Sequence, residues 1–380
     1  MARDDRNRGA LFCAAAGTGA DWRRATEACL EALGAVPAGA NLGFLYTTDG
    51  LAGDFSVAAQ RLREATGVEH WVGTVGMGIC ANGTEYYDAP AVAALVGAFP
   101  PDAFRVFPTL DADLFSLRRT HGDWYRRHAA HFGVVHGDPR SPLTPQLIPA
   151  LAHEVPNAYL VGGLASSRDD YAQFADGPCE AGVSGVLFSD QVAVATCMSQ
   201  GCTPIADKHL ITRCDRNILT TLDQRPALEV FEEDIGQVLA RDLQRVGGYI
   251  FVALPLSGSD TGDYLVRNLM GIDRRGRQLI IGDLVREGQQ VQFCRRDAAS
   301  AWEDLQRTLE SLKARVDGRP RGALYYSCIG RGRHLFGDAS QELQAVQAEL
   351  GDVPLVGFFA NGEIANDQLY GYTGVLTVFL

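Results

Sequence analysis

Three segments of the chain repeat one pattern of apolar and polar positions: an apolar strand, a polar loop, an amphipathic helix and a second strand that ends in Val-Gly. They cover residues 41–73, 132–162 and 323–357. In the first segment, Phe55 and Leu62 belong to an apolar stripe with the spacing of a helix face. Strand–helix–strand units of this length place their two strands parallel, with a right-handed crossover. The pattern therefore predicts three βαβ units.

The second and third units correspond beyond this pattern. Residues 161–166 align with residues 356–361, and each stretch is followed by a strand with the core Gly-Val-Leu, at 185–187 and 374–376. An antiparallel strand is a common addition to a parallel sheet. We therefore predict an α/β fold with an internal duplication, in which each of two related halves is a mixed, largely parallel β-sheet with crossover helices.

The middle of the chain separates these two halves. A polar stretch that runs to residue 223 is followed by a long amphipathic helix, which Pro226 opens. Beyond it the apolar pattern predicts four strands and a long helix, near residues 248–254, 264–272, 278–284, 290–295 and 297–316. We place the connection between the domains at residues 206–222, which leaves one domain at residues 1–205 and another at 223–380.

The composition is that of a globular chain with an acidic balance. Of 380 residues, 46% are hydrophobic, and the formal net charge is −12, which disfavours binding to nucleic acids or anionic membranes. No apolar run reaches the roughly 18 residues that a membrane-spanning helix needs. The opening residues mix both charge signs, unlike a secretion signal, and the nine cysteines form no Cys-x-x-Cys. We therefore expect a cytoplasmic protein with reduced thiols.

Three stretches near the end of the chain resemble a known family. They are residues 322–332 (GALYYSCIGRG), 354–364 (PLVGFFANGEI) and 371–379 (GYTGVLTVF). Together with Gly-Cys-Thr-Pro at 201–204, they resemble FIST domain proteins, with a FIST N domain over roughly the first half and a FIST C domain over the second. The chain departs from the family pattern at residues 365–366, where Ala-Asn replaces the usual Gly-Pro, and Asn suits a turn.

The resemblance implies a sensory, ligand-binding protein rather than a characterised enzyme. Members of the family are proposed to bind small molecules such as amino acids, and to relay this to a signalling protein such as a histidine kinase or a cyclic-nucleotide enzyme. Some bacterial members look like haem-dependent nitric oxide sensors. The leading hypothesis is therefore a small-molecule sensor that requires no cofactor, and a haem-based nitric oxide sensor is the alternative.

The loop after the strand at 323–328 is the leading candidate for the ligand site, because ligands bind at the carboxyl ends of parallel strands. Backbone N–H groups near its glycines, with Arg331 and Arg333, suit a carboxylate or phosphate, and Glu363 suits an ammonium group. The predicted ligand-binding residues are Ser327, Cys328, Arg331, Arg333, Phe358, Asn361, Gly362 and Glu363. The same residues also have an explanation without a ligand. Cys328 is then a buried cysteine at the end of a strand, Arg331 and Arg333 are solvated, and Asn361 and Gly362 form a plain turn.

Two further hypotheses use other side chains. In the haem hypothesis, one histidine of a cluster is the proximal ligand of the iron. Surface and packing positions are the simpler explanation of these histidines. The cluster is His121, His128, His131 and His136. An enzyme reading uses Cys328 as a nucleophile, activated by the neighbouring arginines, with His334 as base. The turns at 165–167 and 81–83 are candidates for a second or shared ligand site.

Overall fold

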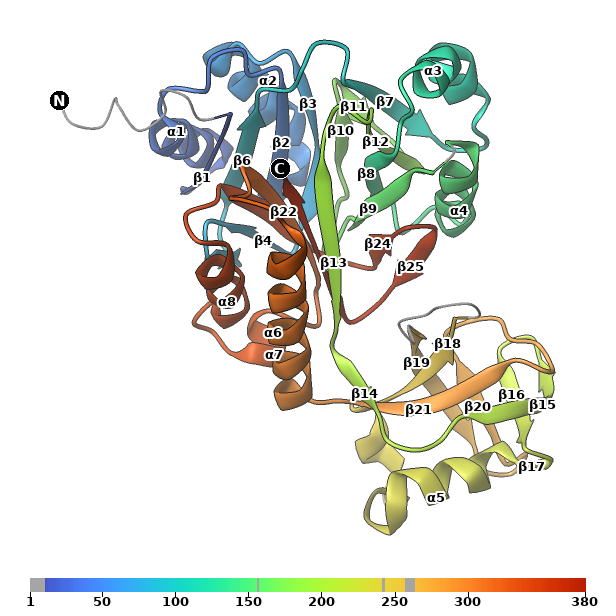
Figure 1. Ribbon diagram of the computed structural model, residues 1–380. Helices are drawn as coiled ribbons and strands as arrows, with labels where there is room; N and C mark the ends of the chain where they lie inside the picture. Colours follow the sequence, from blue (N-terminus) through green and yellow to red (C-terminus); the bar gives the residue numbers. More distant parts are fainter. Residues whose placement is uncertain (1–10, 156, 241–242, 257–263) are drawn as a thin grey trace. The chain divides into compact units, whose positions relative to one another are not determined.

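The chain divides into two compact units. The structure, a computed structural model, describes residues 11–155, 157–240, 243–256 and 264–380 (Figure 1). The first unit combines the chain up to Ser199 with Gln306–Leu380, and the second unit is Gln200–Leu305. The second unit is therefore an insertion into the sequence of the first, and each unit is described by itself.

The first sheet of the first unit contains the earliest of the three predicted βαβ units. Its strands lie in the order β1 (Phe12–Thr18), β6 (Ala91–Gly97), β2 (Leu42–Thr48), β3 (His70–Gly76), β10 (Gln173–Ala175) and β11 (Pro178–Cys179). β2 and β3 run parallel and are joined by the 3₁₀ helix η1 (Asp49–Asp54) and by α2 (Phe55–Thr66). α1 (Trp22–Leu33) and α2 pack on one face of this sheet (Figure 1).

The second sheet repeats this arrangement. Its strands lie in the order β25 (Gln368–Tyr370), β24 (Glu363–Ala365), β9 (Tyr159–Leu164), β8 (Phe132–Gly137), β12 (Val183–Phe188) and β7 (Phe104–Leu110). β8 and β9 run parallel, joined by α4 (Thr144–Glu154). α3 (Phe115–Arg127) and α4 supply apolar side chains to the core on its outer face.

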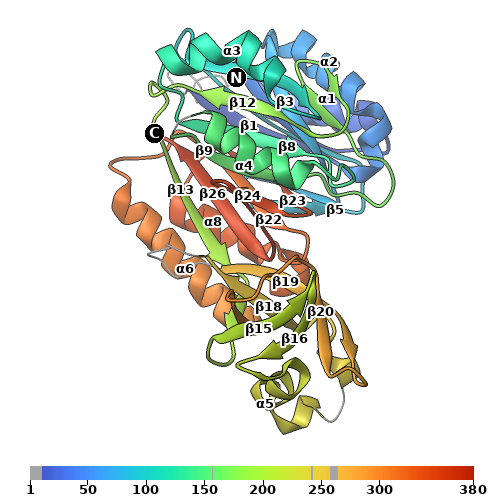
Figure 2. The ribbon, with the colours of Figure 1, turned by 90° about the vertical axis from the view of Figure 1, so that its right-hand side faces the viewer.

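The third sheet has the same plan. Its strands lie in the order β13 (Val194–Gln200), β26 (Thr373–Phe379), β22 (Gly322–Cys328), β23 (Leu355–Ala360), β4 (Gly78–Ala81) and β5 (Thr84–Tyr87). β22 and β23 run parallel, and the chain between them forms the short α7 (Arg333–Phe336) and α8 (Gln341–Leu350). α6 (Ala298–Arg315) leads into β22 (Figure 2).

Each sheet is completed by a hairpin that comes from another segment of the chain. The hairpin β4–β5 follows β3 in sequence but pairs with β23. In the same way, β10–β11 follows β9 and pairs with β3, and β24–β25 follows β23 and pairs with β9. The three sheets are therefore interlocked in a ring of exchanged hairpins.

The three predicted βαβ units are confirmed, but the prediction of largely parallel sheets is wrong. Among the described strands, each of these sheets holds one parallel pair, and the other pairings, β13–β26 aside, are antiparallel. The reason is that every βαβ unit is flanked by an antiparallel strand and extended by an antiparallel hairpin. A short connection is enough to join antiparallel strands, whereas parallel strands need a long crossover. The duplication into two halves is not confirmed, since the same strand order occurs three times.

The inner faces of the three sheets meet in an aromatic core. Along β2, Leu45 packs among the side chains of α1 and α2, whereas Tyr46 points to the opposite face, as the alternation of a strand requires. There the Tyr46 hydroxyl lies 2.8 Å from that of Tyr326 on β22 and 3.2 Å from Nε2 of His136 on β8. All three side chains are fully buried, so the centre of the first unit is polar as well as aromatic.

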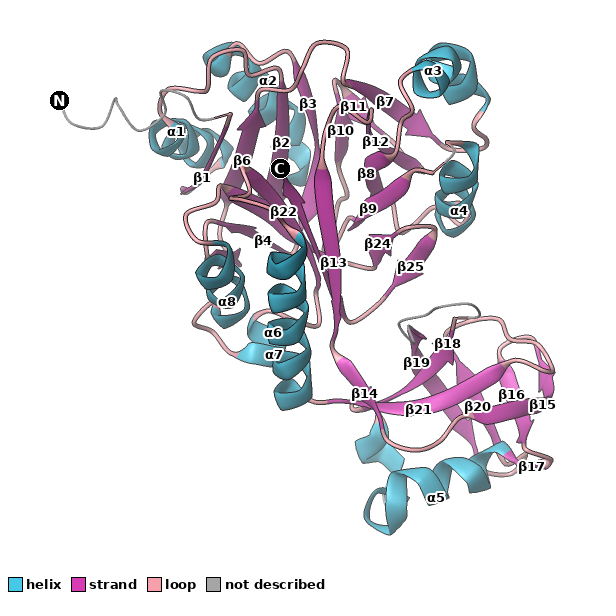
Figure 3. Ribbon diagram, viewed as in Figure 1, coloured by secondary structure: helices cyan, strands magenta, loops and turns pink. Residues whose placement is uncertain are grey.

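The second unit is a closed barrel with a helical segment that is interrupted at Gly236, where φ is +77°. Its strands are shown in magenta in Figure 3. Its strands lie in the order β14 (Cys202–Pro204), β21 (Gln290–Arg296), β15 (His209–Asp215), β16 (Ile218–Leu222), β20 (Gln278–Ile281), β19 (Tyr264–Asp273) and β18 (Ile250–Pro255). Pairing of β18 with β21 closes the barrel, and the short β17 (Arg225–Pro226) pairs with β16. α5 (Ala227–Ala240) packs against the barrel core, and the 3₁₀ helix η2 (Leu243–Val246) follows.

The predicted elements of the middle region are confirmed as β18 to β21, α5 and α6. Residues 206–222, expected to connect two domains, instead contain β15 and β16 of the barrel. The compact units are groups of residues in mutual contact, whereas the expected boundaries refer to family domains. The expected domain boundaries therefore stay a prediction. No helix within the described ranges combines the length and the apolar character needed to cross a membrane.

Candidate functional site

Four charged side chains gather at the carboxyl ends of the strands in the first unit. We call Asp49, Asp88, Arg168 and Arg333 the carboxyl-end network. Asp49 directly follows β2, Asp88 lies in the loop after β5, Arg168 lies in the loop after β9, and Arg333 opens α7 after β22. The network thus draws on segments that follow strands of all three sheets, at the edge where α/β sheets bind ligands.

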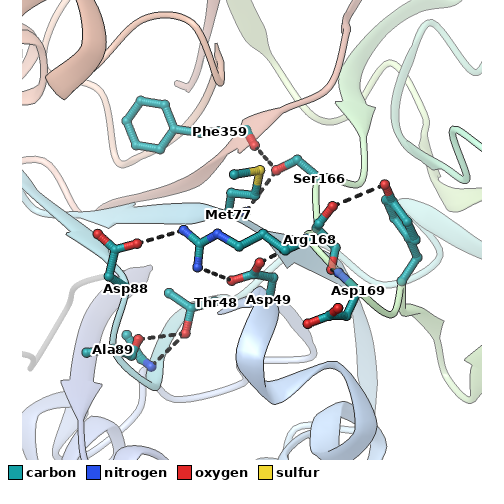
Figure 4. Close-up of polar contacts among 12 residues, drawn as sticks. Thr48, Asp49, Met77, Asp88, Ala89, Ser166, Arg168, Asp169 and Phe359 are labelled. Atoms are coloured by element: carbon teal, nitrogen blue, oxygen red, sulfur yellow. Dashed lines mark hydrogen bonds and ion pairs between the residues drawn. The ribbon is translucent and has the colours of Figure 1, made fainter.

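Arg168 and Asp88 are the centre of the carboxyl-end network (Figure 4). One Arg168 guanidinium nitrogen lies 2.6 Å from Asp88, and another lies 3.7 Å from Asp49. Asp88 also accepts a 2.5 Å bond from Arg333, whose guanidinium stacks 4.3 Å above the Tyr87 ring. The arginine side chains are 46% and 27% exposed, so both cations can be reached from solvent.

Ser166 ties the three strand ends together beneath this network. Its hydroxyl accepts a 2.9 Å bond from the backbone N–H of Met77, after β3, and donates a 2.5 Å bond to the carbonyl of Phe359, in β23 (Figure 4). Since Ser166 itself follows β9, one side chain connects all three sheets.

The predicted residues Ser327 and Arg331 belong instead to a buried cluster around Glu342 of α8. Arg331 donates from Nε to Glu342 at 2.8 Å, and its Nη2 lies 2.8 Å from the same carboxylate oxygen and donates to Ser199 at 3.0 Å. The hydroxyls of Tyr325 and Ser327 and the backbone N–H of Gly332 also donate to Glu342. Neither Arg331 nor Glu342 has any exposed surface. The cluster is an internal ion pair supported by neutral donors.

This pairing changes the role of Arg331. A ligand carboxylate on its guanidinium would have to compete with Glu342, and separating a buried ion pair costs about 3–5 kcal/mol. Gly332 keeps the loop in place, because its φ is +51° and an added Cβ would lie 2.2 Å from the Tyr87 hydroxyl. The assignment of Arg331 as an anion site stays a prediction, and the structure gives its charge a protein partner.

Cys328 and Glu363 lie side by side in the same buried region. Burial raises the pKa of the Cys328 thiol far above its ordinary value, which disfavours the thiolate that a nucleophile needs. Burial also raises the pKa of Glu363 to about 8, although Thr373 donates to it from its backbone and its hydroxyl. Glu363 is thus largely protonated at neutral pH and supplies little charge for an ammonium group.

The remaining predicted residues occupy different surroundings. Phe358 is fully buried and stacks on Tyr46 of the aromatic core, with ring centroids 5.2 Å apart. Asn361 and Gly362 form the turn before β24, where the backbone N–H of Asn361 donates to Leu164. Of the eight predicted binding residues, Arg333 is the one that belongs to the carboxyl-end network.

The four candidate haem histidines lie on successive segments: His121 on α3, His128 and His131 between α3 and β8, and His136 in β8. His128 pairs with Asp102 at 3.1 Å, and His121 lies half-buried on α3. His136 is enclosed by the rings of Tyr46, Tyr326 and Phe358, and burial lowers its pKa to about 3. These surroundings do not fit a haem, and within the described ranges no group of three or more His, Cys, Asp or Glu side chains is arranged to hold a metal ion.

Sequence reasoning did not find Asp49, Asp88 and Arg168. Asp49 carries a recognisable signal, because it directly follows a fully buried strand whose apolar part was predicted, as Arg168 closely follows another. The turn at 165–167 was a candidate, and Ser166 does lie beneath the network. Asp88 has no such signal, since its hairpin reaches the third sheet only through tertiary pairing.

Two family models match consecutive parts of the chain. The FIST N domain matches residues 41–225, and the FIST C domain matches residues 227–366. The boundary between the matches falls inside the barrel unit, so β14 to β16 belong to the first match and α5 to the second. The two family domains are therefore interleaved in the compact units rather than equal to them.

Curated relatives support the same assignment over most of the chain. An uncharacterized protein of Mycobacterium tuberculosis is 33% identical over 327 residues, which cover 81% of this chain and 83% of the relative. An uncharacterized protein of Mycobacterium bovis is 32% identical over 325 residues, with 81% and 82% covered. With both domain models matched in order and relatives of this similarity, the chain belongs to the FIST family.

Proposed function

We propose that this protein is a sensor that binds a small zwitterion of the amino-acid type at the carboxyl-end network and relays the bound state to a signalling protein. The FIST family is associated with sensory signal transduction, which supports the class of function. The observation that carries the ligand class is the composition of the network: two solvent-accessible guanidinium groups beside two carboxylates.

This composition complements a zwitterion. A guanidinium offers forked donors that match a carboxylate, and an aspartate accepts from an ammonium group. Arg168 and Arg333 share Asp88 as a partner, so a ligand carboxylate can take one arginine while Asp88 keeps the other. The hydrogen-bonded Arg333 holds the pKa of Asp88 below its usual value, which keeps the acceptor charged.

The same contacts provide a route for the relay. Arg168 and Asp88 come from loops that follow strands of different sheets, and Ser166 links the strand ends below them. A ligand that binds these charged side chains changes their pairing and favours one arrangement of the loops over another. The shift in the equilibrium between the two arrangements equals the difference in the ligand's binding free energy for them.

Calorimetric titration of the full chain with the twenty L-amino acids, after a thermal-shift screen, tests the proposal. At least one amino acid is expected to bind and to raise the unfolding midpoint. Arg168→Gln and Arg333→Gln should each weaken this binding about 10-fold or more, because a charge-assisted hydrogen bond is lost.

The matched control is Arg61→Gln, which removes another exposed arginine–carboxylate pair, with Glu27 on α1. Its binding should equal that of the unchanged protein. Absence of binding by every amino acid, or equal binding by all three variants, would refute the proposal.

The proposed partner is a signalling enzyme, such as a histidine kinase or a cyclic-nucleotide enzyme, in the cytoplasm. The nine cysteines are free thiols, which suits a reducing compartment. Cross-linking in cells with and without the bound amino acid, followed by identification of the partner, tests this step. A partner set that does not change with the ligand would argue against a relay.

A further inference from the structure

A cavity lies at the opposite ends of the strands from the carboxyl-end network. It measures about 500 Å³, and it is lined by residues that precede β2 and β22 and follow β6, β12 and β26. All three sheets therefore contribute to its walls. Its volume lies within the range of about 300–1,000 Å³ that is typical of small-molecule sites. From its walls and its charge we infer that this cavity, the amino-end pocket, binds a small aromatic carboxylate.

The floor of the amino-end pocket is a cluster of three phenylalanine rings. Phe12 and Phe379 are stacked with centroids 5.2 Å apart, and the Phe99 ring meets each of them edge-to-face, at 5.3 and 5.5 Å. The three side chains are buried to more than nine-tenths. Because the rings pack on one another, only their edges border the cavity, and edge-on contact is one of the geometries that a further aromatic ring prefers.

The floor and rim of the pocket are held in place without a ligand. Asn41 and Phe99 exchange two 3.0 Å hydrogen bonds between the amide side chain and the backbone. Arg321 is fixed through its backbone N–H, which donates to Phe379 at 2.8 Å. Gly322 leaves room for Phe12, because an added Cβ would lie 2.7 Å from that ring. A preformed pocket spends little free energy on ordering when a ligand binds.

Arg321 sets the charge of the preferred ligand. Among the described residues that line the pocket, Arg321 is the one with a charged side chain, and apolar side chains such as Pro100, Pro101 and Val192 form most of the walls. A ring against the phenylalanines with a carboxylate on the Arg321 guanidinium satisfies both features, since guanidinium binds carboxylate through paired donors. The site is independent of the proposed amino-acid site.

Phenylacetate and its neutral isostere phenylacetamide are the probes, titrated into the full chain by calorimetry and by ligand-detected NMR. Phenylacetate is expected to bind, and phenylacetamide to bind about 10-fold more weakly or not at all. Arg321→Gln should reduce phenylacetate affinity about 10-fold and leave that of phenylacetamide unchanged, because only the charged contact is removed. Ala193→Trp, at an exposed lining position, should fill the pocket and abolish binding of both probes.

Two controls separate this site from others. Arg23→Gln removes an exposed arginine of α1 that does not line the pocket, and Arg168→Gln disables the carboxyl-end network; both should bind phenylacetate normally. No binding of either probe would overturn the inference, as would loss of binding in Arg168→Gln. Equal affinity for the two probes would overturn the selectivity for a carboxylate. Amino-acid binding that survives in Arg321→Gln keeps the two proposals distinct.

Discussion

Two buried glutamates of the first unit show how neighbours decide the state of one side chain. Glu342 accepts bonds from the Arg331 guanidinium, two hydroxyls and one backbone N–H. Glu363 accepts from the backbone and hydroxyl of Thr373 and has the Cys328 thiol as a further neighbour, but no guanidinium pairs with it directly within the part of the chain that the structure describes. Burial therefore prevails at Glu363 and raises its pKa to about 8.

Glu363→Gln should stabilise the first unit at neutral and alkaline pH. Between the ordinary pKa of 4.5 and the folded value of about 8, the folded state keeps a proton that the unfolded state has released, so the free energy of unfolding falls as pH rises. The amide has no charge to desolvate and still accepts from Thr373, and we expect a gain on the order of 1–3 kcal/mol at pH 8 and almost none at pH 4.5.

Urea unfolding of both proteins at pH 4.5 and 8 measures this difference. Glu31→Gln, an exposed glutamate on α1, is the matched control and should be neutral at both pH values. A Glu363→Gln protein that is less stable than the parent at pH 8 would contradict the assignment of a protonated carboxyl group.

At the scale of elements, one histidine fastens α5 to the barrel of the second unit. His209 of β15 contacts Asp223 at 2.6 Å through Nδ1 and Asp234 of α5 at 2.8 Å through Nε2. Burial opposes the charged imidazole, but the two hydrogen bonds outweigh it and raise the pKa of His209. The aspartates differ, since burial raises the pKa of Asp234 whereas a bond from the Leu210 backbone lowers that of Asp223. Asp223 is thus the main counter-ion.

The attachment of α5 should weaken as pH rises. A raised folded pKa means that the stabilisation is complete below the unfolded value of 6.5 and is lost as pH rises through the folded value. We expect hydrogen exchange in α5, corrected for intrinsic rates, to be faster at pH 8 than at pH 6, by a factor that corresponds to about 1 kcal/mol.

His209→Gln serves as the test variant for α5, because it keeps a polar side chain that cannot become charged. Its corrected exchange should be independent of pH over this range. Exposed His153 on α4 provides the control, and His153→Gln should leave the pH response of α5 intact. A pH response that persists in His209→Gln would assign it to other groups.

At the scale of the whole molecule, the barrel is an insertion whose two ends are neighbours. The chain leaves the first unit after Ser199 and returns at Gln306. Within the second unit, Thr203 of β14 pairs directly with Arg295 of β21. The first unit has its own sheets and its own apolar cores. A tight turn placed between these two strands therefore satisfies the geometry of a hairpin.

Replacement of residues 204–294 by Asn-Gly should leave a first unit that folds. A two-residue Asn-Gly loop suits a type I′ turn between antiparallel strands, and Thr203 and Arg295 are already paired. We expect a single cooperative thermal transition by calorimetry and unchanged phenylacetate binding. Replacement by Ala-Ala at the same junction, which disfavours this turn, should lower the transition midpoint. An aggregated Asn-Gly protein would show that the first unit needs the barrel to fold.

The sequence predicted the helices and strands better than it predicted which strands pair with one another. The βαβ units were predictable because an apolar strand and an amphipathic helix are local patterns. The exchange of hairpins was not, since β4–β5 and β24–β25 carry the same local signals whichever sheet they join. For the same reason the sequence predicted one role for Arg331 and Arg333, which are two residues apart. In the structure Arg331 is buried with Glu342, and Arg333 pairs with Asp88 at the surface.

The sequence by itself determined the βαβ units, the strands and helices of the middle region and membership of the FIST family. These depend on the order of residue types, which does not change when the chain folds. Only the tertiary structure decided the closure of the barrel, the interlocked sheets, and which charges are paired, buried or open to solvent. Those properties depend on residues up to hundreds of positions apart, such as Tyr46 and Tyr326, and burial and pairing set their energies.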